Sequence, residues 1–228
     1  MSWFDKLYKT FIEDNRYEWL LDGLKNTLII TLGALLIGVV IGSIIAMVKY
    51  FCDDNKKLRV FSWLCDVYVT VIRGIPVTVL LLVFFFIIFA SADNGVPVAI
   101  VAFGINSGAY MAELIRSGIN AIDKGQMEAA RSLGMSKLQA MVKIIFPQAV
   151  KNILPAIGNE CIALLKETSV AGYVAVVDIT KAATNIRNKT YDAVNPILLL
   201  ALVYLVMVVI LTKLLAILER RLRKSDGK

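Results

Sequence analysis

Five polar or charged side chains fall inside segments that are otherwise apolar. They are Arg73, Asn106, Tyr110, Asn159 and Glu160. An ionisable group inside a membrane costs several kcal/mol unless it is paired or hydrated, so such residues commonly mark a pathway. These side chains are therefore candidates for a polar substrate path near mid-membrane. Hydrogen bonding between neighbouring helices is the alternative for the asparagines and for Glu160, and it stays open.

The charged residues have two alternative roles besides lining a substrate path. Arg73 could be a structural partner of Asp66 or Glu113 instead of a path residue. Glu160 or Glu113 could also serve as a proton-binding carboxylate. The chain would then be a proton-coupled secondary transporter or a channel that works without an ATPase.

The sequence offers little for catalysis or metal binding. It contains no histidine, and its three cysteines, Cys52, Cys65 and Cys161, lie at no metal-ligand spacing. The phosphate-binding pattern GxxxxGK[ST] does not occur. We therefore expect no metal site, no cofactor bound by this chain, no enzymatic activity, and no binding or hydrolysis of ATP by this chain.

The stretch from 126 to 147, QMEAARSLGMSKLQAMVKIIFP, has the spacing of two short helices. Met127, Ala130 and Leu133 would fall on one side of the first helix. Gly134 suits a left-handed stop after it, and Ser136 suits the N-cap of a second helix, which Pro147 would end. An amphipathic loop of this kind is suited to being held by a partner.

The order of residues in this stretch resembles a known family. The matching positions are Glu128, Ala129, Ala130, Leu133, Gly134, Ile144 and Pro147. At this spacing they look like the cytoplasmic EAA loop of the permease subunits of ABC importers. Flanking segments, GAYMAELIR at 108–116 and FPQAVK at 146–151, resemble the branch of that family that takes up polar amino acids such as His, Gln, Glu or Arg.

The resemblance implies several partners. It implies two ATPase subunits that bind ATP and Mg²⁺, and a second permease chain in a homodimer or a related heterodimer. It also implies an extracytoplasmic amino-acid-binding protein that delivers the substrate. The EAA loop would be the coupling helix that the ATPases move, and this chain would form the translocation path.

Composition indicates a membrane protein independently of the resemblance. The 228 residues are 58% hydrophobic and 19% charged, with a mean hydropathy of +0.70, which is too apolar for a soluble domain of this length. The net charge of +7 fits cytoplasmic loops. No basic patch interleaved with aromatic residues suggests nucleic acid as a partner.

We expect an all-α integral membrane protein with five transmembrane helices. Residues 1–22 read as an amphipathic helix at the membrane interface, 23–218 as the permease domain with its coupling loop at 116–151, and 219–228 as a basic cytoplasmic tail. The predicted spans are 26–48, 60–89 with a break at 74–76, 96–115, 152–179 with a break at 166–167, and 194–212. Residues 181–195 are expected to form a polar connection.

The distribution of basic residues predicts the orientation. With the N-terminus outside, the inner segments 49–59, 116–151 and 213–228 carry sixteen lysines and arginines, and the outer segments carry seven. Because cytoplasmic loops are enriched in Lys and Arg, the EAA loop and the C-terminus should lie in the cytoplasm. The expected location is the cytoplasmic membrane of a prokaryotic cell.

Overall fold

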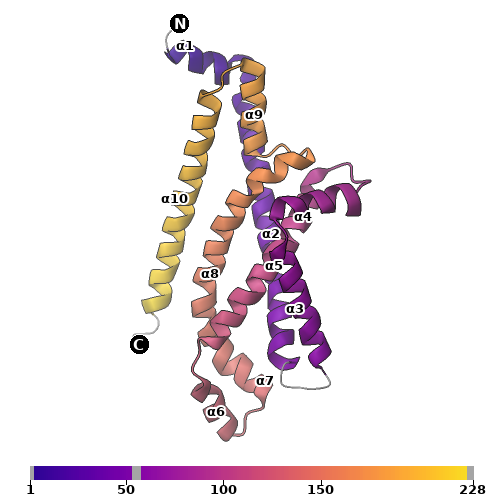
Figure 1. Ribbon diagram of the computed structural model, residues 1–228. Coiled ribbons are helices and arrows are strands. Elements are labelled where there is room, and N and C mark those ends of the chain that lie inside the picture. Colours follow the sequence, from indigo (N-terminus) through magenta and orange to yellow (C-terminus); the bar gives the residue numbers. More distant parts are fainter. Residues whose placement is uncertain (1–2, 53–57, 225–228) are drawn as a thin grey trace.

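Long apolar helices dominate the structure, a computed structural model that describes residues 3–52 and 58–224 (Figure 1). Within these residues all regular structure is helical, as expected. Four continuous stretches are long and apolar enough to cross a membrane. They are Tyr17–Cys52 (α2), Gly95–Asn120 (α5), Lys137–Val174 (α7, η4, α8 and η5) and Asn195–Leu222 within α10 (Asn195–Lys224). The predicted class, an all-α membrane protein, is confirmed.

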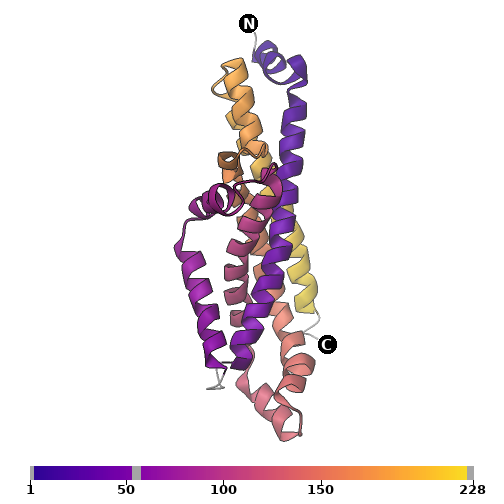
Figure 2. The same cartoon turned by 90° about the vertical axis from the view of Figure 1, so that its right-hand side faces the viewer.

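The predicted second span is broken where the sequence places its proline. Helix α3 (Arg59–Gly74) and the pair α4 (Val77–Val83) and η3 (Phe84–Ile88) meet at an angle of 105°. Ile75 is extended there, as a residue before proline prefers to be. Figure 2 shows α3 beside the lower part of α2 and α4 turning away from it. The bent pair makes a fifth span only if it counts as one crossing, so the five-span count stays a prediction.

Glycines bring α2 and α5 unusually close together. A Cβ on Gly42 would lie 2.4 Å from the Met111 Cβ and 2.8 Å from the Ala112 backbone nitrogen. A Cβ on Gly38 would lie 2.8 Å from the Ser107 Oγ. Small residues at such positions let helix backbones approach closely.

The chain remains helical through Pro147, where the sequence predicted an end. Helix α7 (Lys137–Ala140) runs through the π-helix η4 (Met141–Ile145) into α8 (Phe146–Glu167). The Phe146 N–H bonds to the Met141 carbonyl, five residues back. This wider turn lies directly ahead of Pro147, which occupies the first turn of α8, the part of a helix that tolerates proline best. The prediction that Pro147 ends a helix was therefore wrong.

A helix also occupies most of the predicted polar connection. After α8, the 3₁₀-helix η5 (Thr168–Val174) leads to α9 (Ile179–Thr190). The Asp178 side chain caps α9 by accepting from the N–H groups of Thr180 and Lys181. The apolar face of α9 is buried and consists of Ile179, Ala182, Ala183 and Ile186. The break predicted at 166–167 coincides with the end of α8, but the prediction of a polar connection over 181–195 was wrong, because α9 occupies most of it.

The N-terminal segment turns away from α2 at the end of the molecule opposite α6 (Figure 1). It comprises α1 (Trp3–Leu7), the π-helix η1 (Tyr8–Ile12) and the 3₁₀-helix η2 (Glu13–Asn15). Asp14 and Asn15 have φ of 56° and 52°, which makes the corner. Residues 17–22, grouped with this segment above, belong to α2. At the other terminus, 219–224 extend α10, and 225–228 lie outside the described residues.

The α2–α5 contact predicts a sharp response to one added methyl group. Gly42→Ala should lower the melting temperature of the detergent-solubilised protein, because an extra methyl against backbone costs about 1–3 kcal/mol. Gly74→Ala is the matched control, since its Cβ would meet no atom within 4 Å. Equal melting temperatures for the two variants in a fluorescence-detected unfolding assay would contradict this packing.

Candidate functional site

The loop at the inner end holds a short helix with well-defined caps. Helix α6 (Lys124–Ser132) starts at Asp123, whose side chain accepts from the Gly125 N–H at 2.6 Å. It ends at Gly134, which has φ of +82°, the left-handed stop that the sequence predicted. The Met135 N–H bonds to the Ala130 carbonyl at 3.2 Å and the Gly134 N–H to the Arg131 carbonyl at 3.0 Å. These two bonds form a Schellman motif, which fixes the end of α6.

The two sides of α6 have different surroundings. Ala130 is 2% exposed, and Met127 is half-buried against an apolar cluster that includes Ile119 and Ile145. Leu133 is 84% exposed, although its N–H still bonds to the Ala129 carbonyl at 3.1 Å, as in an α-helix. The prediction that Leu133 shares a side with Met127 and Ala130 was therefore wrong. Ala130 packs inside the chain.

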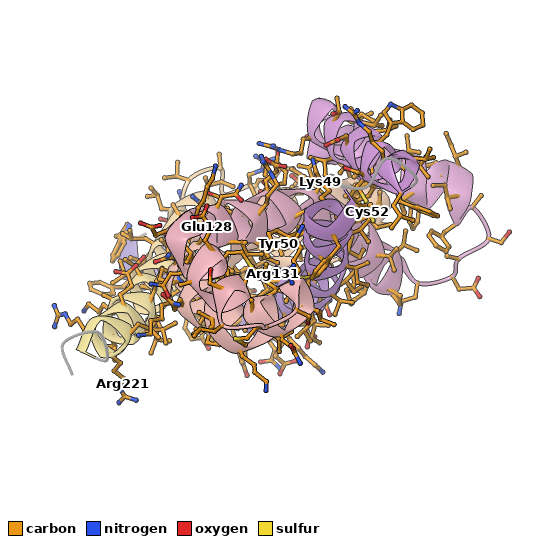
Figure 3. All side chains as sticks on the ribbon, turned by 90° about the horizontal axis from the view of Figure 1, so that it is seen from below. Lys49, Tyr50, Cys52, Glu128, Arg131 and Arg221 are labelled. Atoms are coloured by element: carbon orange, nitrogen blue, oxygen red, sulfur yellow. The ribbon has the colours of Figure 1, made fainter. Side chains whose placement is uncertain are left out.

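The exposed surface of α6 and its C-cap is mixed in character. It includes Glu128, Ala129 and Arg131 of the helix and Leu133, its C-cap. Figure 3 views this end directly and shows Glu128 and Arg131 at its surface, with Arg221 of α10 far to one side. Of the other predicted coupling residues, Ile144 is half-buried and Pro147 is exposed.

An open cavity of about 610 Å³ separates α6 from the ends of the long helices. Its walls include Tyr50 of α2, Ile119 of α5, Ile145 of η4 and Met127 of α6. The helix therefore touches the bundle through one buried edge and is otherwise bordered by open space.

Polar side chains of α5 and α8 meet deeper in the bundle. The Ser107 Oγ donates to the Glu160 Oε1 at 3.0 Å. The Asn106 Nδ2 donates to the Glu167 Oε2 at 3.5 Å. The structure thus places two of the predicted path residues, Asn106 and Glu160, at the same helix interface. Ser107 was missed because a single hydroxyl hardly changes the hydropathy of an apolar span.

The other predicted path residues have different neighbours. Arg73 lies over the Tyr110 ring, with its Cζ 5.0 Å from the ring centroid, so this pair comes together although no pairing was foreseen. The two acidic residues considered as alternative partners of Arg73 form ion pairs with other residues: Asp66 with Lys49, and Glu113 with Arg116 at 2.9 Å. Within 3–52 and 58–224, no ion pair joins Arg73 to either of them.

Asn159 does not join the α5–α8 contact. Its side chain is exposed, and its Nδ2 donates to the Pro155 carbonyl of its own helix at 3.1 Å. Among the described residues no group of three or more His, Cys, Asp or Glu side chains could hold a metal ion.

Comparison with known proteins identifies relatives over nearly the whole chain. Residues 38–224 match the family described as binding-protein-dependent transport system inner membrane component. The arginine transport system permease protein ArtQ of Bacillus subtilis is 36% identical, with 91% of this chain and 94% of that protein covered. The probable glutamine ABC transporter permease protein GlnM of the same organism is 35% identical, with 92% and 96% covered.

Solved structures show the same similarity. A crystal structure of an amino acid ABC transporter with histidines has a chain that is 40% identical, with a TM-score of 0.83 over 92% of this chain and 98% of that one. An inward-facing structure of the MetNI methionine ABC transporter matches with a TM-score of 0.77 at 20% identity, over 90% of this chain and 96% of that one. The second match speaks for the fold alone.

The contact between Glu160 and Ser107 can be tested without any assumption about function. Glu160→Gln, Ser107→Ala and the double variant form a thermodynamic cycle. A direct hydrogen bond between membrane helices predicts a coupling of about 0.5–1.5 kcal/mol in unfolding free energy, so the two single effects should not add. Additive effects in a denaturation assay would show that the two side chains do not interact.

Proposed function

This chain belongs to the family of inner membrane components of binding-protein-dependent transport systems and is the permease component of an ABC amino acid transporter, and we propose that α6 couples it to its ATPases. ATP-driven closure of the ATPase subunits would push α6. The long helices would then switch between inward-open and outward-open packings, a two-state element biased from a distant site. Glu128, Ala129 and Leu133 would form the contact with the ATPase.

The geometry of α6 carries this proposal. The helix lies beyond the ends of α5 and α8, capped at both ends, with one side anchored by Ala130 and the other exposed. A solvated turn would need neither the Asp123 cap nor the Schellman motif. A rigid, partly detached helix is what a lever between two proteins requires.

The energy source and the partners follow from the same premise. The sequence has no phosphate-binding GxxxxGK[ST] pattern, so ATP and Mg²⁺ would be bound by two partner ATPase subunits. A second permease chain, identical or related, would complete the path, and an extracytoplasmic binding protein would deliver a polar amino acid. The relatives named for arginine and for glutamine support that substrate class.

The α5–α8 interface is the proposed substrate path. Ser107 and Glu160 form one polar contact there, and Asn106 and Glu167 form another. The Arg73 guanidinium over Tyr110 adds a cation on the α3 side. Together these groups can exchange hydrogen bonds with the charged ends of an amino acid. A proton-coupled transporter using Glu160 or Glu113 is not favoured, because the relatives are ABC permeases.

We further propose that α6 and the C-terminus lie in the cytoplasm and the N-terminus outside, in the cytoplasmic membrane. Figure 1 shows the N-terminal segment and α6 at opposite ends, with α10 finishing on the side of α6. The excess of basic residues on the inner segments supports this orientation.

Coupling through α6 makes Gly134 the sharpest position to test. Gly134→Val forces a β-branched residue to φ of +82°, at a cost of about 1–3 kcal/mol, and should misplace α6. No atom lies within 4 Å of the position of its Cβ, so the effect would come from the backbone alone. We expect the variant to insert normally but to lose the ATPase on an affinity column, or to keep it and lose hydrolysis stimulated by the binding protein.

Gly134→Asn is the matched control, because asparagine tolerates the left-handed region far better than valine. It should keep ATPase retention and stimulated hydrolysis near wild-type levels. If Gly134→Val also keeps both, α6 is not the coupling element.

A further inference from the structure

A groove at the outer end, far from α6, has a wall of basic side chains. It lies between the N-terminal segment and the turn that joins α9 to α10, with a volume of about 360 Å³. Its charged lining residues are Lys6, Lys9, Arg16 and Lys189 against Glu13 and Asp192. Four cations thus face two anions, and the groove favours an anionic occupant.

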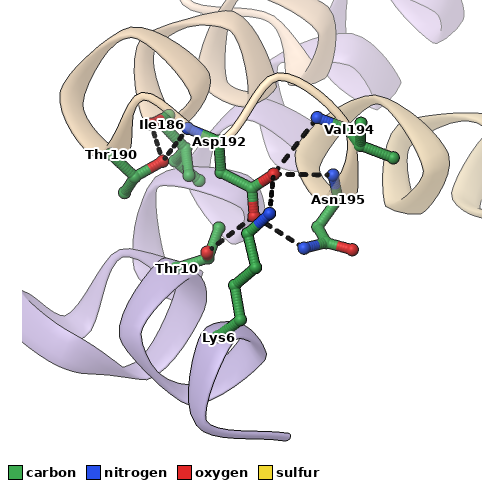
Figure 4. Close-up of polar contacts among 7 residues, drawn as sticks. All are labelled: Lys6, Thr10, Ile186, Thr190, Asp192, Val194 and Asn195. Atoms are coloured by element: carbon green, nitrogen blue, oxygen red, sulfur yellow. Dashed lines mark hydrogen bonds and ion pairs between the residues drawn. The ribbon is translucent and has the colours of Figure 1, made fainter. Parts of the chain in front are cut away.

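Asp192 forms the fixed wall of this groove (Figure 4). One of its carboxylate oxygens accepts from the Thr10 Oγ1 at 3.0 Å and from the Asn195 Nδ2 at 2.6 Å, and the Lys6 Nζ lies 3.6 Å from the other. Burial by itself would raise the pKa of Asp192, but these hydrogen bonds and those from backbone N–H groups lower it to about 2. Lys6 is therefore already compensated, and the N-terminal segment is tied to the α9–α10 turn.

Arg16 is the one buried cation of the groove lining. It is 6% exposed, and its guanidinium donates to the Lys9 carbonyl at 2.5 Å and to the Asp14 carboxylate at 2.6 Å. Its Nε has no hydrogen-bond partner, the only such buried side-chain atom in the part of the chain that is described. A buried donor without an acceptor costs free energy, so the surroundings of Arg16 are not fully satisfied by the chain itself.

Two cations remain available for a ligand. Lys9 and Lys189 are exposed, and neither has an ion pair within the ranges 3–52 and 58–224. Glu13 is the remaining anion of the lining. Two lysines on opposite walls can hold one phosphate group between them.

Apolar side chains adjoin the groove on its membrane side. Trp3, Phe4, Tyr8 and Ile12 of the N-terminal segment are all exposed, and so are Val194 and Leu198 where α10 begins its apolar run. An amphipathic segment with aromatic residues at such a boundary lies in the headgroup region of a bilayer. The groove therefore meets lipid headgroups at the height where α10 enters the hydrocarbon.

We propose that this groove binds the phosphate of an anionic phospholipid, such as phosphatidylglycerol, in the leaflet at that end of the molecule. Lys9 and Lys189 would hold the phosphate, Arg16 would support it, and the acyl chains would lie against Trp3, Phe4 and the start of α10. The site would fix the N-terminal segment at the interface and, through Asp192, the α9–α10 turn. It does not depend on the role proposed for α6.

The test uses the intact transporter complex in mixed micelles of phosphatidylglycerol and phosphatidylcholine. Native mass spectrometry should show that the complex retains phosphatidylglycerol in preference. Lys9→Gln and Lys189→Gln should each reduce that retention about fivefold, the weight of one lysine near an anionic surface. Lys25→Gln is the control, because this exposed lysine lies at the same end but lines a different cavity, and it should change nothing.

Four results would overturn the proposal. The first is equal retention of the two lipids by the wild-type complex, and the second is unchanged retention in the double lysine variant. The third is displacement of phosphatidylglycerol by inorganic phosphate at equal concentration, which would indicate a site for free phosphate. The last is a double variant that keeps the lipid but binds the extracytoplasmic binding protein more weakly, which would assign the groove to an acidic protein surface.

Discussion

The close approach of α2 and α5 is the constraint on which the rest of the molecule depends. Gly38 and Gly42 of α2 bring its backbone against Ser107, Met111 and Ala112 of α5. In return, Gly104 and Gly108 of α5 receive Ile37 and Ile41 of α2. Helix α2 covers one side of α5, and 67% of the residues in the most apolar stretch of α5 are buried. In the corresponding stretch of α10 no residue is buried. Helix α5 is thus the central element, and the side chains on its other faces form the contacts with α8 and α3.

This central position links the two proposed working parts. The same helix that carries Asn106 and Ser107 continues to Asn120, and Asp123 then caps α6. At its inner end Gly118 of α5 packs so tightly on Ile153 of α8 that an added Cβ would lie 2.4 Å away. Displacement of α6 would therefore shift α5 against α8 and alter the Ser107–Glu160 and Asn106–Glu167 contacts. Packed helices of this kind respond as bistable units, which suits alternating access.

The sequence correctly predicted those features of the backbone that a single residue determines. The break at Pro76, the left-handed Gly134 and the Ser136 cap each follow from the conformational limits of one residue, and the structure has all three. Helix α9 was missed because its charged residues obscured the apolar spacing of Ile179, Ala182 and Ile186, which together with the Asp178 cap could have revealed it. The stacking of Arg73 on Tyr110 depends on tertiary packing, which no single residue type predicts. The continuation of the helix through Pro147 depends on a π-turn, which likewise has no single-residue pattern in the sequence.

The proposed coupling requires α6 to touch the ATPase, and cross-linking measures that contact directly. In an assembled transporter whose permease has Cys52, Cys65 and Cys161 replaced by serine, Leu133→Cys would present a thiol at a position that is 84% exposed. Tyr191→Cys, 94% exposed at the opposite end of the molecule, is the matched control. A short thiol cross-linker should join residue 133 to the ATPase subunit and leave residue 191 unlinked to it. Failure at residue 133, or an ATPase adduct at residue 191, would contradict the proposed coupling.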